Sequence, residues 1–330
     1  MSVFRLYRRW IAALGLSAAA LGCPLASRAA LTPQSSWQAS QVLVQYLEYA
    51  PDGTLLVTAD GGGVGELWTT RGTSVAVLKG QRAPMFRAHF SADGQSLITT
   101  GYDGSAWIWS RSGQELQRLQ LHRAATADAY LLSPTATAPA GLVSSSDDGT
   151  VVLHDSQGST LWSASFSGTT RQLRPTSSTG LIAASSDNGQ IHLITPDPQR
   201  RSATVRSFQT PHGRINLLRF SPDQRQLAAA GIDGTVSIYN LDGRLLQRLR
   251  VSEKGWSRGL SYCAGSPSPS LLSIGNDGTL RQWSPQGTLI TSLQLSPQSP
   301  LTAVDCSPNG RQAAVANAAG RLWLVGVSGN

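Results

Sequence analysis

Arginine recurs at similar intervals through the middle of this chain, in a pattern suited to binding acidic groups. The residues are Arg82, Arg123, Arg171, Arg214 and Arg258, and Trp256 stands two positions before the last of them. A guanidinium group forms charge-assisted hydrogen bonds with carboxylates, and arginine and tryptophan are enriched where binding energy concentrates in protein interfaces. This set therefore predicts a surface that binds a protein or peptide of acidic character.

Residues that commonly perform catalysis form no persuasive catalytic grouping. The five histidines are far apart in the sequence, at His89, His122, His154, His192 and His212. No Cys-x-x-Cys motif occurs. We therefore expect no catalytic residue, no metal site and no cofactor, and we predict a binding protein.

A short phrase recurs along almost the whole chain. Its turn glycines lie at 63, 104, 149, 189, 234, 278 and 320, a spacing of 40 to 45 residues. An aromatic or bulky residue follows five positions later, as Trp109 follows Gly104. Aspartate precedes four of these glycines, at Asp103, Asp148, Asp233 and Asp277, where we expect it to stabilise the turn. A fixed period of this size indicates a repeat architecture.

Each copy of the repeat reads as four short strands. In the fifth copy, residues 215–220, 226–231, 235–239 and 245–249 have the apolar content and alternation of strands. Proline and aspartate favour a turn after the first strand, and Asp233-Gly234 suits a two-residue hairpin. Four strands joined by three hairpins form one antiparallel sheet, so the sequence predicts an all-β protein.

This phrase resembles the WD-repeat family of β-propellers. The first turn of the family unit is matched by Ala50-Pro51-Asp52-Gly53, Ser91-Ala92-Asp93-Gly94, Ser221-Pro222-Asp223 and Ser307-Pro308-Asn309-Gly310, and the second turn by the Asp-Gly pairs. The resemblance covers roughly residues 37–330, although the Trp-Asp pair that ends the family's third strand is never complete. It implies a seven-bladed propeller in which each blade is a four-stranded antiparallel sheet.

The family also has a buried hydrogen-bond relay, which joins a histidine before the first strand to the turn aspartate. Only His122 and His212 stand at suitable positions. The resemblance therefore implies a relay in blades three and five at most. In the other blades we expect the aspartate to cap its own turn.

The ends of the propeller require a closure. The seventh copy ends after its third strand, whereas residues 36–42 precede the first copy and alternate like a strand. We expect that segment to complete the last blade and close the ring, which leaves only short, protected edges. The domain then spans residues 36–330, with residues 30–35 as a short linker.

The resemblance assigns the arginines to one face. In such propellers, the loops that enter the inner strands lie with the Asp-Gly turns, so the arginines and Trp256 would surround the channel mouth. We predict a non-catalytic scaffold or assembly factor that displays these loops rigidly. A binder of small ligands or glycans is the alternative, and an exposed Trp256 would favour it. A propeller hydrolase is a weaker alternative, because the inner strands offer only Glu48 and Asp305 as carboxylates.

Residues 1–29 have the pattern of a secretory signal peptide. Arg5, Arg8 and Arg9 form a basic start, an apolar stretch of about a dozen residues follows, and small residues precede a cleavage point after Ala29. Lipidation at Cys23 and twin-arginine export remain open alternatives. We therefore expect an exported protein, in the periplasm or an equivalent lumen, that contacts a membrane only through a lipid anchor.

Composition limits the partners and the redox chemistry. The net charge is +8, and removal of the four arginines in residues 1–29 would leave 23 basic and 19 acidic residues, or about +4. This moderate charge does not indicate nucleic-acid binding. We expect a monomer. Cys263 and Cys306 occupy similar positions in neighbouring copies, and we expect two buried free thiols because adjacent blades should hold them too far apart for a disulfide.

Overall fold

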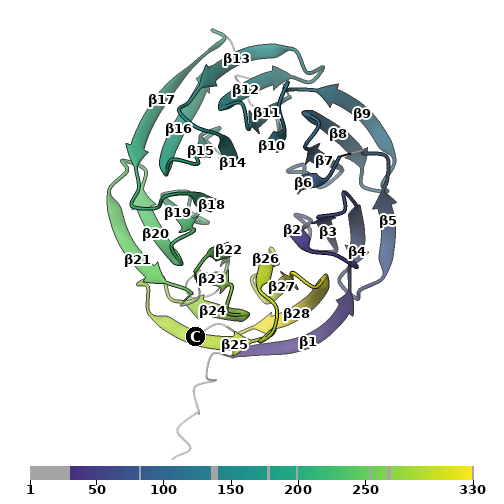
Figure 1. Ribbon diagram of the computed structural model, residues 1–330, viewed down its shortest axis with the longest axis vertical. Helices are drawn as coiled ribbons and strands as arrows, with labels where there is room; N and C mark the ends of the chain where they lie inside the picture. Colours follow the sequence, from purple (N-terminus) through teal and green to yellow (C-terminus); the bar gives the residue numbers. More distant parts are fainter. Residues whose placement is uncertain are drawn as a thin grey trace, which may run out of the picture.

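Seven antiparallel sheets form a closed ring in the computed structural model, which describes residues 30–81, 83–134, 140–176, 179–197, 200–252, 255–265 and 269–328. Each sheet has four strands, and the described residues contain no helix. Figure 1 shows the sheets arranged around a central channel, with the first strand of each copy innermost. The predicted all-β, seven-bladed propeller is confirmed.

The strands of each blade run from the channel to the outer edge in sequence order, except in the last blade. Blades one to three are β2 (Val44–Tyr49), β3 (Leu55–Asp60), β4 (Gly65–Thr69), β5 (Ser74–Leu78); β6 (Met85–Phe90), β7 (Ser96–Gly101), β8 (Ser105–Ser110), β9 (Glu115–Gln120); and β10 (Thr126–Leu132), β11 (Gly141–Ser146), β12 (Thr150–Asp155), β13 (Thr160–Ser165). Blades four and five are β14 (Thr170–Pro175), β15 (Ile182–Ser186), β16 (Gln190–Asp197), β17 (Ser202–Gln209); and β18 (Ile215–Phe220), β19 (Gln226–Gly231), β20 (Thr235–Asn240), β21 (Leu245–Arg250). Blades six and seven are β22 (Ser257–Cys263), β23 (Ser270–Gly275), β24 (Thr279–Trp283), β25 (Leu289–Gln294); and β26 (Leu301–Cys306), β27 (Gln312–Asn317), β28 (Arg321–Val327), β1 (Leu31–Gln38).

The hydrophobic core lies between neighbouring blades. Leu67 and Leu78 of blade one pack with Met85, Leu97 and Trp109 of blade two, and all five side chains are buried. Because successive residues of a strand face opposite sides of its sheet, each blade can contribute apolar side chains to both of its neighbours. The central strands are therefore largely buried on both faces, whereas the outer strands alternate toward solvent.

The second hairpin of each blade depends on glycine at one position. Gly104 has φ of +78°, and a Cβ atom there would lie 2.3 Å from the backbone oxygen of His122. A side chain is therefore excluded by both backbone conformation and space. The aspartate before this glycine accepts the backbone N–H two residues ahead, at Asp103, Asp148, Asp233 and Asp277.

Two blades contain a histidine paired with the turn aspartate. His122 Nδ1 lies 3.5 Å from Asp148, and His212 Nδ1 lies 3.0 Å from Asp233. Blade two has an amide in the corresponding place: Thr99 donates to Gln81 and accepts from the indole of Trp109. A relay of this kind links the second and third strands of a blade to the loop that enters it.

The N-terminal strand closes the ring. β1 pairs with β28 from Leu31 opposite Val327 to Gln38 opposite Arg321, and Trp37 packs against Trp68 of blade one with ring centroids 6.0 Å apart. Closure by an N-terminal strand was predicted, but the strand begins five residues earlier than expected and ends at Gln38. The apolar residue Leu31, which we had placed in the linker, fixes its start because its side chain is buried against blades six and seven.

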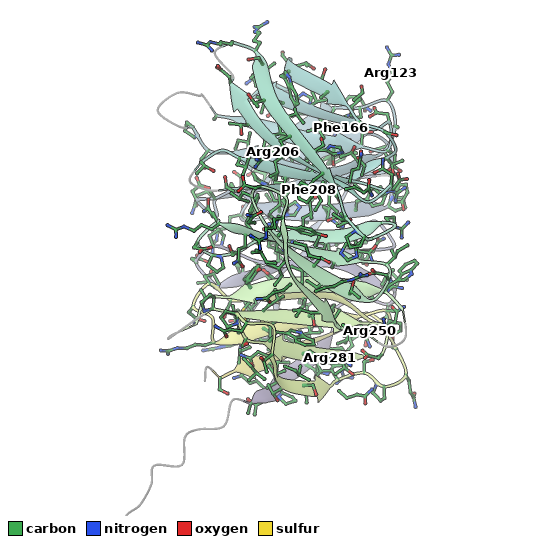
Figure 2. The ribbon with its side chains drawn as sticks, turned by 90° about the vertical axis from the view of Figure 1, so that its left-hand side faces the viewer. Arg123, Phe166, Arg206, Phe208, Arg250 and Arg281 are labelled. Atoms are coloured by element: carbon green, nitrogen blue, oxygen red, sulfur yellow. A yellow bond between two sulfur atoms is a disulfide. The ribbon has the colours of Figure 1, made fainter. Side chains whose placement is uncertain are left out.

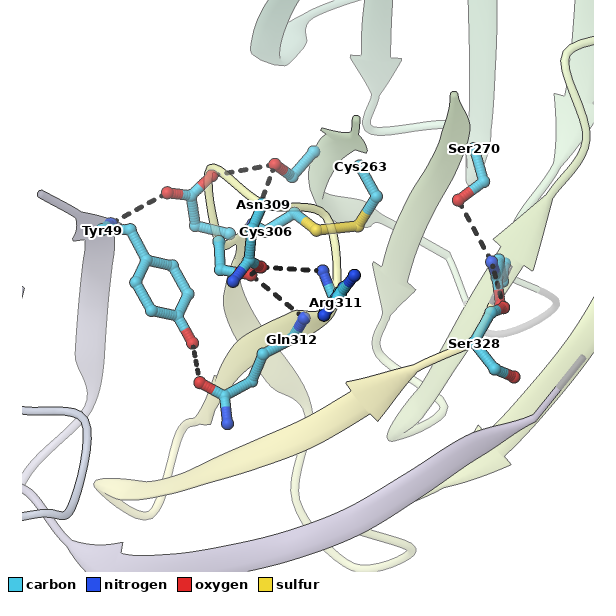
Figure 3. Close-up of a disulfide and its surroundings, with 12 residues drawn as sticks. Tyr49, Cys263, Ser270, Cys306, Asn309, Arg311, Gln312 and Ser328 are labelled. Atoms are coloured by element: carbon cyan, nitrogen blue, oxygen red, sulfur yellow. Dashed lines mark hydrogen bonds between the residues drawn. A yellow bond between two sulfur atoms is a disulfide. The ribbon is translucent and has the colours of Figure 1, made fainter. Parts of the chain in front are cut away.

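Cys263 and Cys306 form a disulfide, so the prediction of two free thiols is wrong (Figure 3). Their Cα atoms are 5.3 Å apart, within the range that a disulfide requires. In the strand register, Tyr262 is the residue equivalent to Cys306 of the next blade, and Cys263, which pairs with Ser270, lies one residue further along its strand. The inner strands converge at the channel, and this offset brings the two sulfur atoms together.

Removal of β1 should open the ring. We compare a chain that begins at residue 30 with one that begins at residue 39, which leaves β28 as an unpaired edge. The shorter chain loses a full strand ladder and the packing of Leu31 and Trp37, so we expect a loss of more than about 5 kcal/mol in unfolding free energy. Urea unfolding followed by circular dichroism measures this loss. Equal midpoints for the two chains would contradict closure by this strand.

The disulfide should stabilise the seam between blades six and seven. In a chain that begins at residue 30, replacing both Cys263 and Cys306 by serine should lower the unfolding free energy by about 4 kcal/mol, because the loop between them becomes free in the unfolded state. Mass spectrometry after alkylation without reductant checks the bond directly. Two alkylated thiols in the oxidised, folded protein would show that the disulfide does not form.

Candidate functional site

Successive turns of a blade lie at opposite ends of its strands, so the Asp-Gly turns share one face of the ring. The loops that enter the inner strands lie beside them. The backbone nitrogens of Leu121 and His122, for example, both donate to the oxygen of Gly104 in the turn of the same blade. We call this surface, formed by the Asp-Gly turns and the entering loops, the turn face.

Three predicted site residues form one cluster on the turn face. Trp256 is 39% exposed, and the guanidinium carbons of Arg214 and Arg258 lie 5.3 Å and 4.9 Å from the centre of its ring. Arg214 precedes the inner strand of blade five, and Trp256 and Arg258 stand at the start of the inner strand of blade six. Stacking over an indole is favourable for a guanidinium and leaves its N–H groups available for a ligand.

Two positive charges are held close together in this cluster. The Nε atom of Arg258 donates to the side-chain oxygen of Asn276 at 2.6 Å, which fixes its orientation. Burial lowers the pKa of Arg258, and the charge of Arg214 lowers it further. Repulsion between the two guanidinium groups would be relieved by an anion between them. The cluster is therefore chemically suited to a carboxylate.

The other predicted arginines do not join the cluster. Arg171 forms an ion pair with Asp147 at 3.1 Å, so its charge is partly neutralised. Arg123 is exposed, and Figure 2 shows its side chain extending away from the ribbon. Arg82 lies outside the described residues, as does Cys23. The structure thus brings Arg214, Arg258 and Trp256 together.

An aromatic pair on blade two was not predicted. Phe86 stacks on Tyr102 with ring centroids 3.9 Å apart, and Tyr102 is half exposed. Phe86 begins the inner strand and Tyr102 directly precedes the Asp-Gly turn, so the pair belongs to the turn face. Tyr102 could have been identified in the sequence. It precedes the Asp-Gly turn of its copy as Ile232 does in another copy, and the turn itself does not require an aromatic ring at this position.

Polar residues occupy one equivalent position on every inner strand, and the sequence analysis missed most of them. In blades one to seven this position holds Glu48, His89, Tyr130, Arg174, Arg219, Ser261 and Asp305. The sequence analysis identified only Glu48 and Asp305 among them. Alignment of the seven inner strands on the turn glycine would have revealed this ring, because its members share one place in each copy.

A histidine bridges two of the channel carboxylates. His89 is buried, with Nδ1 2.8 Å from Glu48 and Nε2 2.8 Å from Asp128. Glu48 also accepts the backbone N–H of Phe90, and Asp128 accepts that of Leu173. These contacts join the inner strands of blades one to four.

The pKa values of the two predicted carboxylates move in opposite directions. Burial opposes the ionisation of Glu48, but His89, Arg174 and Tyr46 outweigh it and lower its pKa to about 2. Burial, with the negative charge of Glu48, raises the pKa of Asp305 although Arg219 opposes the shift. Asp305 accepts hydrogen bonds from the backbone of Tyr49 and the hydroxyl of Ser261. Both carboxylates are therefore engaged in structural contacts.

Two features are not found among the residues that the structure describes: a cluster of metal-binding side chains and a membrane-spanning helix. Among its residues, no group of three or more histidine, cysteine, aspartate or glutamate side chains is placed to hold a metal. His154 and His192 are buried beside serine hydroxyls, and burial lowers the pKa of each to about 4. Within the same residues, no helix is long and apolar enough to cross a membrane.

Glu48 should make the propeller sensitive to acid. Because its folded pKa lies below the unfolded value, its contribution is complete above about pH 5 and is lost as the pH falls towards 2. This contribution should be about 3 kcal/mol. Glu48→Gln should therefore be less stable than the wild type at pH 7 and should approach it near pH 2. Urea unfolding of wild type and Glu48→Gln across this pH range tests the prediction. Glu115→Gln, at an exposed glutamate, is the matched control. Parallel stability curves for wild type and Glu48→Gln would contradict this role.

Comparison with known proteins places the chain among repeat proteins. The family model described as "WD domain, G-beta repeat" matches residues 72–110 and 203–240. WD repeat-containing protein slr1409 of Synechocystis is 38% identical over 298 residues, which cover 90% of this chain and 88% of that protein. WD repeat-containing protein slr1410 of the same organism is 34% identical over 216 residues, and the match covers 65% of this chain and 62% of slr1410.

More distant similarity extends to eukaryotes. The SIR4-interacting protein SIF2 of Saccharomyces cerevisiae is 25% identical over 251 residues, which cover 69% of this chain and 44% of that protein. Propellers with these repeats generally act as protein-interaction scaffolds and not as enzymes. The repeat period, the seven closed blades and the match along nearly the whole of slr1409 agree, and the chain belongs to the WD-repeat β-propeller family.

Proposed function

We propose that this protein is an exported, non-catalytic interaction platform that binds an acidic protein or peptide through its turn face. The observation that carries this proposal is the cluster of Arg214, Trp256 and Arg258. It combines an exposed aromatic ring with two guanidinium groups whose donors point to no carboxylate within ion-pair distance among the described residues. Such a cluster has the composition of an interface hot spot.

The fold supports rigid display of this cluster. The two arginines come from different blades, and the ring fixes the distance between those blades. Asn276, which directly follows the second strand of blade six, accepts a hydrogen bond from the guanidinium of Arg258 and holds it in place. Binding to such preorganised side chains loses little conformational entropy, so a modest contact area can give useful affinity.

Export is supported by the disulfide and by the signal-like sequence of residues 1–29. Disulfides persist in oxidising compartments and are rare in the cytosol of most organisms. A buried bond between Cys263 and Cys306 suits a periplasm or an equivalent lumen. Within this proposal the protein acts as a monomer, and Cys23 is the residue at which a lipid anchor would attach.

A small ligand or glycan is the second candidate, and the exposure of Trp256 favours it. Sugars commonly stack on exposed indole rings, and Trp256 is 39% exposed. The two flanking guanidinium groups, however, favour a negatively charged ligand over a neutral one. SIF2, a relative named for its interaction with SIR4, also agrees with a protein as the partner.

Charge reversal in the cluster should abolish binding of acidic peptides. We expect Arg214→Glu/Arg258→Glu to bind fluorescein-labelled hexaglutamate at least ~10-fold more weakly than the wild type, because two charge-assisted contacts become repulsive. Fluorescence anisotropy at fixed ionic strength measures this affinity. A crosslinked pull-down from the native envelope fraction, with the same proteins, then identifies the natural partner.

The matched control is Arg225→Glu/Arg311→Glu, which reverses two exposed arginines in the first turns of their blades, on the opposite face. It changes the net charge equally and should retain both the peptide and the partner. Equal losses in the two variants would show a general charge effect and contradict the proposed site. Loss of a neutral glycan in Trp256→Ala, with retention in the charge-reversal variant, would favour the second candidate.

A further inference from the structure

Two arginines on the inner strands contact Tyr46, and a third lies near Glu48, its hydrogen-bond partner. The guanidinium carbon of Arg87 is 5.1 Å from the centre of the Tyr46 ring, and Nη2 of Arg219 is 3.5 Å from the Tyr46 hydroxyl. Nη1 of Arg174 is 4.0 Å from Glu48, the carboxylate that accepts the hydrogen bond of the same hydroxyl. Blades two, four and five thus direct positive charge towards a single point beside blade one.

These arginines have fewer partners than buried guanidinium groups require. The Nε atoms of Arg87 and Arg174 are buried without a hydrogen-bond partner. Arg219 is 8% exposed, and its two hydrogen bonds are to the backbone of Leu218 and to Tyr46. Among the described residues, no carboxylate lies within 4.0 Å of a nitrogen of Arg87 or Arg219. Buried charge without a partner is strongly unfavourable, so these donors indicate a missing acceptor.

The channel carboxylates are occupied by other donors. Glu48 accepts from His89, Tyr46 and the backbone of Phe90. Asp128 accepts from His89 and from a backbone N–H of blade four, and Asp305 accepts from a backbone N–H of blade one and a serine of blade six. Their oxygens are therefore engaged in contacts between blades, and of the three arginines only Arg174 lies within 4.0 Å of one of them, Glu48.

The group comprises three arginines, Arg87, Arg174 and Arg219, and three acidic residues, Glu48, Asp128 and Asp305, which already accept the hydrogen bonds described above. Arg174 and Arg219 belong to blades four and five and reach residues of blade one across the ring (Figure 1).

We propose that the channel contains a binding site for one small oxyanion, such as phosphate, sulfate or a short carboxylate, held by Arg87, Arg174 and Arg219 beside Tyr46. This site is separate from the turn face and does not depend on the proposed partner. The anion supplies the missing acceptor for the guanidinium donors. It joins blades two, four and five across the channel and so stabilises the closed ring.

Binding is measured on the full mature chain by equilibrium dialysis against inorganic phosphate, with sulfate and acetate as further probes. We expect saturable binding of at least one of these anions at one per chain. The midpoint temperature of thermal unfolding should rise by roughly 4 °C when the anion concentration is a hundred times its Kd, because the anion binds the folded state alone. Chloride at the same ionic strength is the control and should give no saturable rise.

Variants locate the anion. Arg219→Gln and Arg174→Gln should each weaken binding ~10-fold or more, since each removes charge-assisted contacts. Arg123→Gln, an exposed arginine outside the channel, should bind like the wild type. Failure of the wild type to bind any of the three anions would overturn the proposal, and this measurement does not depend on the folding of the variants. Equal binding by wild type, Arg174→Gln and Arg219→Gln would also overturn it, because the anion would then lie elsewhere.

Discussion

Each blade presents apolar side chains on both faces of its sheet, and closure of the ring gives every face a neighbour. The seam between the last blade and the first is therefore the place on which the whole core depends. Three kinds of contact hold the last blade in the ring, at different radii. β1 pairs with β28 at the outer edge, Asp305 accepts the backbone N–H of Tyr49 near the channel, and a disulfide joins the inner strands of blades six and seven.

The same closed frame allows the copies to diverge. A blade position that is repeated seven times need not hold one residue type, because the turns and the strand ladders already determine the fold. At the channel-facing position, blades one and seven provide carboxylates, blade two a histidine, and blades four and five arginines. Each carboxylate also accepts a backbone N–H of the next blade, so a polar residue in the channel serves the packing of the ring.

The turn face and the channel differ in ways that suit different tasks. On the turn face, Arg214 and Arg258 flank an exposed indole and remain accessible, which suits a large partner. In the channel, Arg174 and Arg219 are largely buried and meet blade one from the opposite side, which suits a small group and the integrity of the ring. Similar side chains thus differ in accessibility between the two places.

The architecture follows from the sequence alone, because the period of the turn glycines and the alternation of the strands are local properties that agree along the chain, and Asp-Gly hairpins reinforce them in four copies. The sequence also identified the members of the turn-face cluster, since the repeat places Arg214, Trp256 and Arg258 on one face. The residues that meet between blades, by contrast, depend on the tertiary structure. The start of β1 at Leu31, the disulfide between Cys263 and Cys306, and the bridge of His89 between Glu48 and Asp128 all depend on the stagger and convergence of neighbouring inner strands. That geometry arises when the ring closes, and the repeat pattern of a single blade contains no information about it.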